Sequence, residues 1–486
     1  MSHIESTKSV TGTIIETDIP SRLDNLAFGP WHIRAVIALG ITWILDGLEV
    51  TIVGAIGSVL QEPEALGLTA TEVGMSGSVY IAGAIIGALL FGHLADRHGR
   101  KKLFLVTLAL YVVSTLATAG SVGFWSFALC RFFTGMAIGG EYSAINSAID
   151  ELIPARVRGV VDLGINGSYW VGTALGAVLS GILLDPRVLG HANGFRAAFA
   201  LGAVLAFAIV IVRKFLPESP RWLMVRGRHD EALSIVADIE KHSTQFDPQA
   251  PPRTIRIRLG EHIGLAQVAH VIFTQYRSRA ILGLSLMIAQ AFFYNAIFFT
   301  YSLTLTQFYS VRPEHVGRYL LPFALGNFLG PLVLGRLFDV IGRKPMIVFT
   351  YAMSGILLLL TGVAFQQQLL TAVTHTLAWS AAFFFASAAA SSAYLTVSEL
   401  FPLELRALAI ALFYAVGTGT GGLIAPALFG RLIESHSRVE LFFGYVLGSS
   451  LMLIAAAVTY KLGVPAERRG LEDLAPPLSA ADQTAR

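Results

Sequence analysis

The chain has 486 residues, of which 54% are hydrophobic and only 14% charged, with 47 glycines and a formal net charge of +3. A soluble protein carries about 25% charged residues, so this composition excludes a soluble enzyme and indicates a lipid environment. The small positive charge is spread over connecting segments, which gives no indication of nucleic acid as a partner. Cys130 is the only cysteine, which excludes a disulfide within the chain and does not favour a thiolate metal site.

The chain begins with a polar stretch, residues 1–33, which we expect to form a cytoplasmic tail that ends in a short interfacial helix. Twelve mainly apolar windows follow, each long enough to cross a hydrocarbon core of about 30 Å as an α-helix. Their approximate limits are 34–60, 73–94, 103–120, 124–148, 160–184, 196–216, 280–308, 318–338, 346–364, 372–397, 407–431 and 440–462. This pattern predicts an all-α membrane protein with twelve transmembrane helices.

The windows divide into two six-helix halves, residues 34–216 and 280–463, which are joined by a polar linker at 217–279 and followed by a tail at 464–486. Lys and Arg gather in the linker and in three short turns. These turns are 95–102, 155–158 and 341–345. Because short cytoplasmic loops are enriched in positive charge, we expect both termini on the cytoplasmic side of an inner membrane.

Two charged motifs occur once in each half. The first, G-x-L-x-D-x-x-G-R-K, spans 92–101 and 335–344, and the second, E-x-x-P-x-x-x-R, spans 151–158 and 399–406. Two different motifs that recur in the same order indicate an internal duplication. Duplicated sets of membrane helices are typical of transporters with two halves and the substrate between them.

The acidic and basic residues of these motifs can form a latch at the cytoplasmic ends of the helices. Charge-assisted hydrogen bonds between them would hold one arrangement of the halves and open in the other. The residues expected in this gate are Gly92, Asp96, Arg97, Gly99, Arg100, Glu141, Glu151, Arg158, Asp339, Gly342, Arg343, Glu399 and Arg406. The alternative is that the motifs only set the topology, which would account for Lys and Arg but not for the acidic residues.

Several segments resemble the major facilitator superfamily. Residues 217–223, 158–159 and 398–402 are similar to segments of its sugar porters. Residues 46–49 (D-G-L-E) and 139–142 (G-G-E-Y) are similar to motifs of its proton-coupled metabolite and aromatic-acid symporters and of the synaptic-vesicle-protein-like group. The resemblance covers most of the chain and implies the twelve-helix fold and a transport function.

Three ionisable residues fall inside the apolar windows at similar depth. Asp46 and Glu49 lie roughly 18 to 22 Å above the cytoplasmic end of the first helix at about 1.5 Å per residue, and Arg131 lies at nearly the same height in the fourth. A buried charge is costly in a bilayer unless it is paired or faces a wet cavity. We expect one acid to pair with Arg131 when ionised and to release it for the substrate when protonated. The alternative is a static ion pair between the first and fourth helices.

The seventh window carries the substrate-binding candidates Gln290, Tyr294 and Asn295. This segment is similar to the sugar-porter motif Q-Q-x-x-G-x-N-A-x-x-Y-Y, which implies that these side chains face the substrate. The motif positions that differ include those held by Ala289, Phe293 and Phe299. The loss of amide and hydroxyl donors does not favour a hexose. Aromatic residues on such a helix are also often packing residues, so Tyr294 has both interpretations.

These features predict a secondary active transporter that moves a small organic metabolite, either an organic or aromatic acid or a sugar-like solute, by alternating access with symported protons. The alternatives are a uniporter or exchanger of the same fold, and a solute sensor that does not transport. The expected partners are the substrate, protons and the lipid bilayer, and the monomer is the expected working unit.

No enzymatic activity, cofactor or metal is expected, and a proton gradient is the expected energy source. Residues 417–422 (G-T-G-T-G-G) resemble a nucleotide-binding turn, but they lie inside an apolar window with no preceding strand and no P-loop lysine. We therefore predict that these glycines serve close helix packing.

Overall fold

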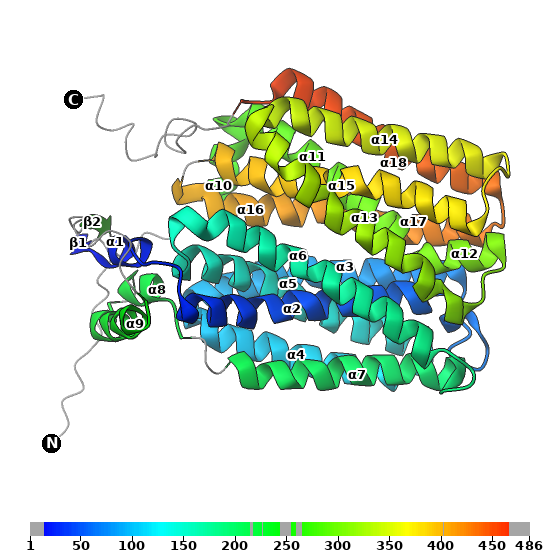
Figure 1. The fold of residues 1–486 in the computed structure, drawn as a ribbon, viewed down its shortest axis with the longest axis horizontal. Coiled ribbons are helices and arrows are strands. Elements are labelled where there is room, and N and C mark those ends of the chain that lie inside the picture. The colour runs from blue at the N-terminus through cyan, green and yellow to red at the C-terminus, as the bar shows by residue number, and fades with distance from the viewer. Residues whose placement is uncertain are drawn as a thin grey trace.

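A computed structural model describes residues 14–213, 217–225, 227–243, 254–258, 265–401 and 403–465. Almost all of these residues are helical, and the long helices run side by side along the long axis of Figure 1. The described part of the chain starts and finishes at one end of this bundle, which we call the linker end. The opposite end is the distal end.

Twelve membrane crossings form two six-helix halves, as the sequence predicts. The first half contains α2 (Pro30–Ile56), α3 (Ala70–His98), α4 (Arg100–Ala119), α5 (Phe124–Leu152), α6 (Ala155–Leu183) and α7 (Gly190–Arg213). The second contains α11 (Arg277–Phe298) with α12 (Tyr301–Tyr309), α13 (Pro313–Val340), α14 (Arg343–Gln366), α15 (Ala372–Leu400), α16 (Leu403–Gly417) with the π-helical η2 (Thr418–Gly422) and α17 (Leu423–Glu434), and α18 (Arg438–Leu462). A short 3₁₀ turn, η1 (Val59–Gln61), follows α2.

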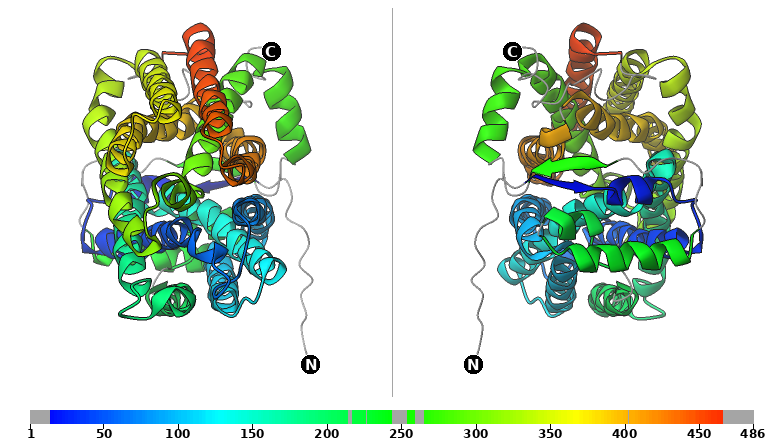
Figure 2. Two further views of the ribbon diagram at one scale, coloured as in Figure 1. Left: turned by 90° about the vertical axis from the view of Figure 1, so that its right-hand side faces the viewer. Right: turned by 90° about the vertical axis from the view of Figure 1, so that its left-hand side faces the viewer.

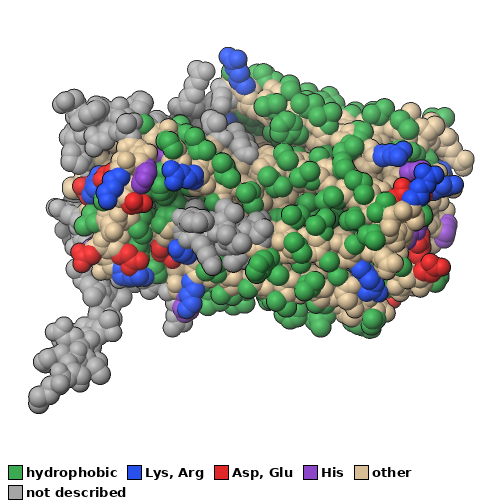
Figure 3. All heavy atoms as spheres, turned by 60° about the horizontal axis from the view of Figure 1, so that its bottom comes forward, with side chains coloured by type: hydrophobic (Ala, Val, Ile, Leu, Met, Phe, Trp, Pro, Cys, Tyr) green, Lys and Arg blue, Asp and Glu red, His purple; other side chains and the backbone are tan. Residues whose placement is uncertain are grey.

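The outer surface of the bundle is apolar along its middle and charged at its two ends, as Figure 3 shows for one face. Exposed apolar side chains on this belt include Val113, Leu116, Leu129, Val204 and Phe207. Over their described residues, nine of the crossings are long and apolar enough to span a membrane. A continuous apolar belt of this kind is the surface that a bilayer requires.

Glycines spaced four residues apart let neighbouring helices approach to backbone contact. A Cβ on Gly83 would clash with the carbonyl of Phe132, and a Cβ on Gly139 would clash with the carbonyl of Ala84. Small residues at such spacing allow close packing in membranes, where van der Waals contact replaces the hydrophobic effect between helices. The small-residue spacing therefore fixes α3 against α5.

Close contact between glycines and backbone carbonyls also joins α2 to α6. Gly47 lies against the carbonyl of Tyr169, and Gly172 lies against the carbonyl of Ile44. This contact holds the acidic stretch of α2 directly beside α6. The glycines of η2 also serve packing, since a Cβ on Gly421 would clash with the backbone of α11.

The two halves lie one above the other in Figure 1 and meet along α3–α17 and α6–α13. Near the distal end, Gly74 of α3 lies against the carbonyl of Pro426, and Gly317 of α13 lies against the carbonyl of Ala177. Figure 2 shows the helices of both halves end-on. The described contacts between the halves therefore include backbone packing at the distal end.

A small assembly outside the bundle covers the linker end (Figures 1 and 2). It contains the antiparallel strands β1 (Ile14–Thr17) and β2 (Ile255–Arg258) and the helices α1 (Ile19–Asp24), α8 (Pro220–Val225), α9 (His229–Lys241) and α10 (Leu265–Thr274). Ile19, Leu23, Leu223 and Val236 form the core between α1, α8 and α9. Arg22 pairs with Glu240 through two hydrogen bonds of 2.9 and 2.7 Å, and this contact raises the pKa of Arg22 above its usual value.

The helix limits differ from the predicted windows by a few residues at most ends, and two of these differences lie at predicted domain limits. The predicted tail reaches residue 33, but α2 begins at Pro30, because proline has the φ angle of a first helical turn and needs no N–H there. The predicted linker reaches residue 279, but α11 begins at Arg277. Glycine turns mark both repeats of the first charged motif, since Gly99 and Gly342 have φ angles of 97° and 118° before α4 and α14.

Glycine substitutions test the packing of α3 against α5. We expect Gly139→Ala to lower the free energy of unfolding by about 1–3 kcal/mol, because the new methyl group meets a backbone carbonyl that cannot move aside. Gly167→Ala in α6 is the matched control, because its Cβ meets no atom within 4 Å. It should leave stability unchanged or raise it by up to about 1 kcal/mol. Thermal unfolding in detergent measures both, and equal melting temperatures would contradict the packing argument.

Candidate functional site

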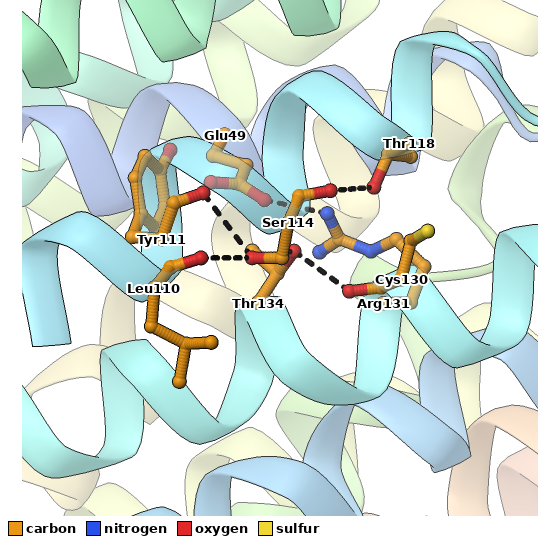
Figure 4. Close-up of polar contacts among 8 residues, drawn as sticks. All are labelled: Glu49, Leu110, Tyr111, Ser114, Thr118, Cys130, Arg131 and Thr134. Carbon is orange, nitrogen blue, oxygen red and sulfur yellow. Dashed lines mark hydrogen bonds and ion pairs between the residues drawn. The ribbon is translucent and has the colours of Figure 1, made fainter.

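The deepest charge pair joins α2 to α5. Arg131 Nη1 donates to Glu49 Oε1 at 2.5 Å, and the two side chains are only 1% and 2% exposed. Figure 4 shows the carboxylate and the guanidinium pointing toward each other. Both residues lie about 10 Å below the distal ends of their helices at about 1.5 Å per residue. The structure therefore brings together two of the three midplane candidates.

Aromatic rings enclose this pair on several sides. The Arg131 guanidinium lies 4.6 Å from the ring centre of Tyr80 and 5.6 Å from that of Phe199. The Tyr111 side chain lies beside the Glu49 carboxylate (Figure 4). Rings stabilise a cation through their negative faces, so α3, α4 and α7 all contribute to holding a charge pair inside an apolar half.

The guanidinium keeps unused hydrogen-bonding capacity. Within the described part of the chain, Arg131 Nε and Nη2 have no hydrogen-bond partner although both atoms are buried. Buried donors without a partner are uncommon in native structures and often mark functional sites. Nearby hydroxyl groups bond elsewhere, since Thr134 donates to Ser114 Oγ and to the Cys130 carbonyl.

Asp46 has a different environment from Glu49. It is 7% exposed and lies within electrostatic range of Tyr80 of α3, Tyr169 of α6 and Tyr414 of α16. Tyr169 is in turn close to Tyr294 of the second half. Asp46 therefore lies beside the interface between the halves, whereas Glu49 lies inside the first half.

The second half presents a ring of aromatic and amide groups. The Tyr294 hydroxyl donates to Asn327 Oδ1 at 2.7 Å and lies near Ser387, and its ring packs edge-on against Phe383 at 4.9 Å. Gln290 is 8% exposed, and its side chain lies near the hydroxyl group of Tyr394, which is 38% exposed. Tyr294 and Gln290 thus occupy one polar layer on α11.

The Asn295 side chain makes different contacts from those of Gln290 and Tyr294. Its amide nitrogen donates to the carbonyl of Ala291 in its own helix at 2.7 Å, and it packs beside Gly422. The amide therefore stabilises α11 against η2 in this conformation. The sequence motif grouped Asn295 with Gln290 and Tyr294, because the spacing of residues along a helix does not show which groups each side chain hydrogen-bonds.

Several residues at this site were not predicted. Tyr80, Tyr169, Asn327 and Tyr414 lie in apolar windows of four different helices. A phenol or amide in the middle of a membrane helix is a usable signal, because its polar group needs a partner there. Which of them approach Asp46 or Tyr294 depends on helix rotation, which the sequence does not show.

The predicted gate lies mostly beyond what the structure describes. Side chains are not described for eight of its members, Asp96, Arg97, Arg100, Glu151, Arg158, Asp339, Glu399 and Arg406. Gly99 and Gly342 form the turns noted above, Gly92 and Arg343 are half-buried near the linker end, and Glu141 is 5% exposed within α5. Glu218, which follows α7, accepts hydrogen bonds from the backbone of Lys101 at the start of α4. The latch itself stays a prediction.

Comparison with known proteins decides the family. The family model described as "Sugar (and other) transporter" matches residues 41–475. The chain belongs to this family. Its relatives include the niacin transporter NiaP of Acinetobacter baylyi, which is 29% identical over 94% of this chain and 99% of the relative, and the D-xylose transporter of Levilactobacillus brevis, which is 26% identical over 87% and 91%.

Solved structures show the same fold. The partially occluded inward-open form of the xylose transporter XylE from Escherichia coli covers 90% of this chain and 99% of its own length, with a TM-score of 0.69 and 19% identity. The chain is therefore a multi-pass membrane protein with the major facilitator fold. Its family consists of transporters of small molecules and not of enzymes, and no group of three potential metal ligands occurs among the described residues.

Among the described residues, polar contacts also connect the two halves at the distal end. His191 of α7 lies between two carboxylates, with Nδ1 at 2.7 Å from Glu62 Oε2 and Nε2 at 3.3 Å from Glu314 Oε2 of α13. The backbone N–H of Thr71 donates to Glu434 at 2.8 Å. We call the first of these contacts the distal bridge. It joins the halves at the distal end of the α6–α13 contact.

A double-mutant cycle tests the buried charge pair. We expect Glu49→Gln to lower the free energy of unfolding by about 3–5 kcal/mol, because it leaves the Arg131 charge buried and unpaired. The double variant with Arg131→Gln should recover much of this loss, because it removes the unpaired charge. Thermal unfolding of the four proteins gives the coupling free energy, and additive effects would contradict the pairing.

Loss of the distal bridge should favour separation of the halves at the distal end. We expect Glu314→Gln to broaden and lengthen the distance distribution between spin labels at Val188 and Leu369, which are exposed in distal loops of different halves. The labels are placed in a Cys130→Ala background, since Cys130 is the only native cysteine. Glu64→Gln, at an exposed distal residue, is the matched control. Identical distributions for both variants would exclude a gating role for the bridge.

Proposed function

We propose that this protein is a secondary active transporter that carries a small aromatic or heteroaromatic carboxylic acid across the inner membrane together with protons. The halves alternate access to a site at their interface, and both termini face the cytoplasm at the linker end. No bound cofactor takes part, the proton gradient supplies the energy, and the monomer is the working unit. The observation that carries the proposal is the buried pair of Glu49 and Arg131 inside the first half, behind Asp46 and that interface.

Proton coupling follows from what the pair can do. While Glu49 is ionised it neutralises Arg131, and its protonation leaves the guanidinium charge uncompensated in a low-dielectric half. The negative charge of an anionic solute bound at the interface would then lie a short distance from Arg131 and compensate its positive charge. Binding of the proton and of the anion thus favour each other, which is the thermodynamic requirement for symport.

The aromatic layer supports the choice of solute. Tyr169 from one half and Tyr294 and Tyr394 from the other supply ring faces and hydroxyl groups, and Gln290 supplies an amide. Rings of this kind pack against a planar solute and their hydroxyls can donate to a carboxylate. The relative named as a niacin transporter supports the same solute class. A sugar has no planar face and requires many more hydrogen-bonding groups.

A uniporter or exchanger is the alternative within the same fold. The nearly complete burial of Glu49 and Arg131 and their enclosure by Tyr80 and Phe199 support it, because a static pair would be held in the same way. In that case the pair would fix α2 against α5 and would not exchange protons during transport. A solute sensor that does not transport is the third possibility.

Solute-driven proton movement in sealed proteoliposomes tests the proposal. The panel contains nicotinate, benzoate, short aliphatic carboxylates, xylose and glucose, and an internal pH dye reports proton entry. We expect nicotinate or benzoate to drive protons inward with the native protein. Glu49→Gln should abolish the proton signal while exchange of labelled solute continues, because the neutral amide cannot cycle between charge states.

Asp46→Asn and Glu64→Gln separate the possible outcomes. Loss of the proton signal in Asp46→Asn alone would assign the coupling to Asp46 and would contradict the role given to Glu49. Glu64 is exposed in a distal loop, so its variant should behave as the native protein. Uptake of a solute without proton movement by the native protein would replace symport with uniport or exchange, and a response to sugars alone would exclude the aromatic-acid class.

A further inference from the structure

A pocket opens between α13 and α15 of the second half near the distal end, and all of its lining residues belong to that half. Its volume is about 320 Å³, and it lies between the first turns of α13 and α15, which are neighbours in Figure 1. It is lined by His315, Arg318, Tyr319 and Pro322 of α13 and by Val373, Thr376 and Leu377 of α15. Nothing in the proposed transport cycle uses these groups.

Arg318 gives the pocket a positive charge near the distal end of α13. It lies five residues into α13, or about 8 Å below the distal end of the helix, and its side chain is exposed. Within the described part of the chain, Arg318 forms no ion pair, whereas Arg312 lies 4.0 Å from Glu314. An unpaired arginine at the edge of the hydrocarbon region requires an anion or water as its partner.

The helix face below Arg318 is a continuous apolar stripe. Leu321, Leu325, Phe328 and Leu332 follow at helical spacing and are 38% to 67% exposed. Val373 and Leu377 add exposed apolar surface from α15. A ligand with a charged head and an acyl chain matches this order of a cation above an apolar stripe.

The backbone adds a hydrogen-bond acceptor to the pocket. Pro322 has no N–H, so the carbonyl of Arg318, four residues earlier, lacks its helical donor. A free carbonyl beside a cation suits a head group that contains both a phosphate and hydroxyl groups.

We propose that this pocket binds an anionic phospholipid of the distal leaflet, with its phosphodiester on Arg318, a head-group hydroxyl on the free carbonyl and an acyl chain along the α13 stripe. Both walls belong to the second half, so the site persists while the halves move. The proposal does not depend on the transported solute or on proton coupling.

Quenching by brominated lipids tests the site locally. A fluorophore is attached at Leu377→Cys in the Cys130→Ala background, and the full chain is reconstituted into phosphatidylcholine vesicles that contain a minor fraction of dibrominated phosphatidylglycerol or dibrominated phosphatidylcholine with the same chains. We expect about fivefold stronger relative binding of phosphatidylglycerol at this position, as one arginine at a membrane surface provides. A fluorophore at Val113→Cys on α4, which is lipid-exposed and remote in sequence, should show no preference.

Charge variants decide whether Arg318 is responsible. Arg318→Gln should remove the preference and Arg318→Lys should keep most of it, which also controls for folding. Arg312→Gln removes the same charge at the residue that precedes α13, outside the pocket, and should keep the preference. Equal loss of the lipid preference in both glutamine variants would show that general surface charge causes the effect, and this result would overturn the proposed site.

Three further outcomes would also overturn the proposal. Equal quenching by both lipids in the native chain would show that the pocket does not select an anionic head group. Relief of quenching by soluble glycerol 3-phosphate would show that the pocket binds the free anion and not the lipid. If a second copy of the chain covered the pocket, neither brominated lipid would quench at Leu377.

Discussion

The ion pair of Glu49 and Arg131 is the constraint on which the first half depends. Two charges 1% and 2% exposed in an apolar bundle are tolerable only as a pair with further support. That support comes from Tyr80, Phe199 and Tyr111, which belong to three other helices. The rings and the pair therefore determine how five of the six helices of this half can be rotated.

Close backbone contact is the second constraint, and it acts both within and between the halves. Glycines on α3 and α5 lie against each other's carbonyls, so those two helices can move only as a unit. Gly74 and Gly317 make the same kind of contact across the halves near the distal end. There it is joined by the distal bridge, which a rocking motion can break more readily than the packing within a half.

The environment of each acid separates their possible roles. Glu49 is enclosed within one half, while Asp46 lies beside Tyr169 and Tyr414 at the interface. A solute at that interface would therefore meet tyrosines and Gln290 first, with Asp46 beside them and the Glu49 pair behind. At the linker end, the β1–β2 ribbon and the Arg22–Glu240 contact connect the tail to the linker, an arrangement absent from the sequence-based prediction.

The sequence by itself determined the twelve crossings, the duplication and the packing role of the glycines at 417–422. A bilayer requires apolar runs of nearly constant length, and glycine spacing is local, so both can be read along the chain. Only the tertiary structure decided that Glu49 rather than Asp46 meets Arg131, and that the Asn295 amide bonds within its own helix. Likewise, only the structure brought His191 between Glu62 and Glu314, which come from three separate segments. Such contacts depend on the rotation and crossing of helices far apart in sequence, and no local pattern records those angles.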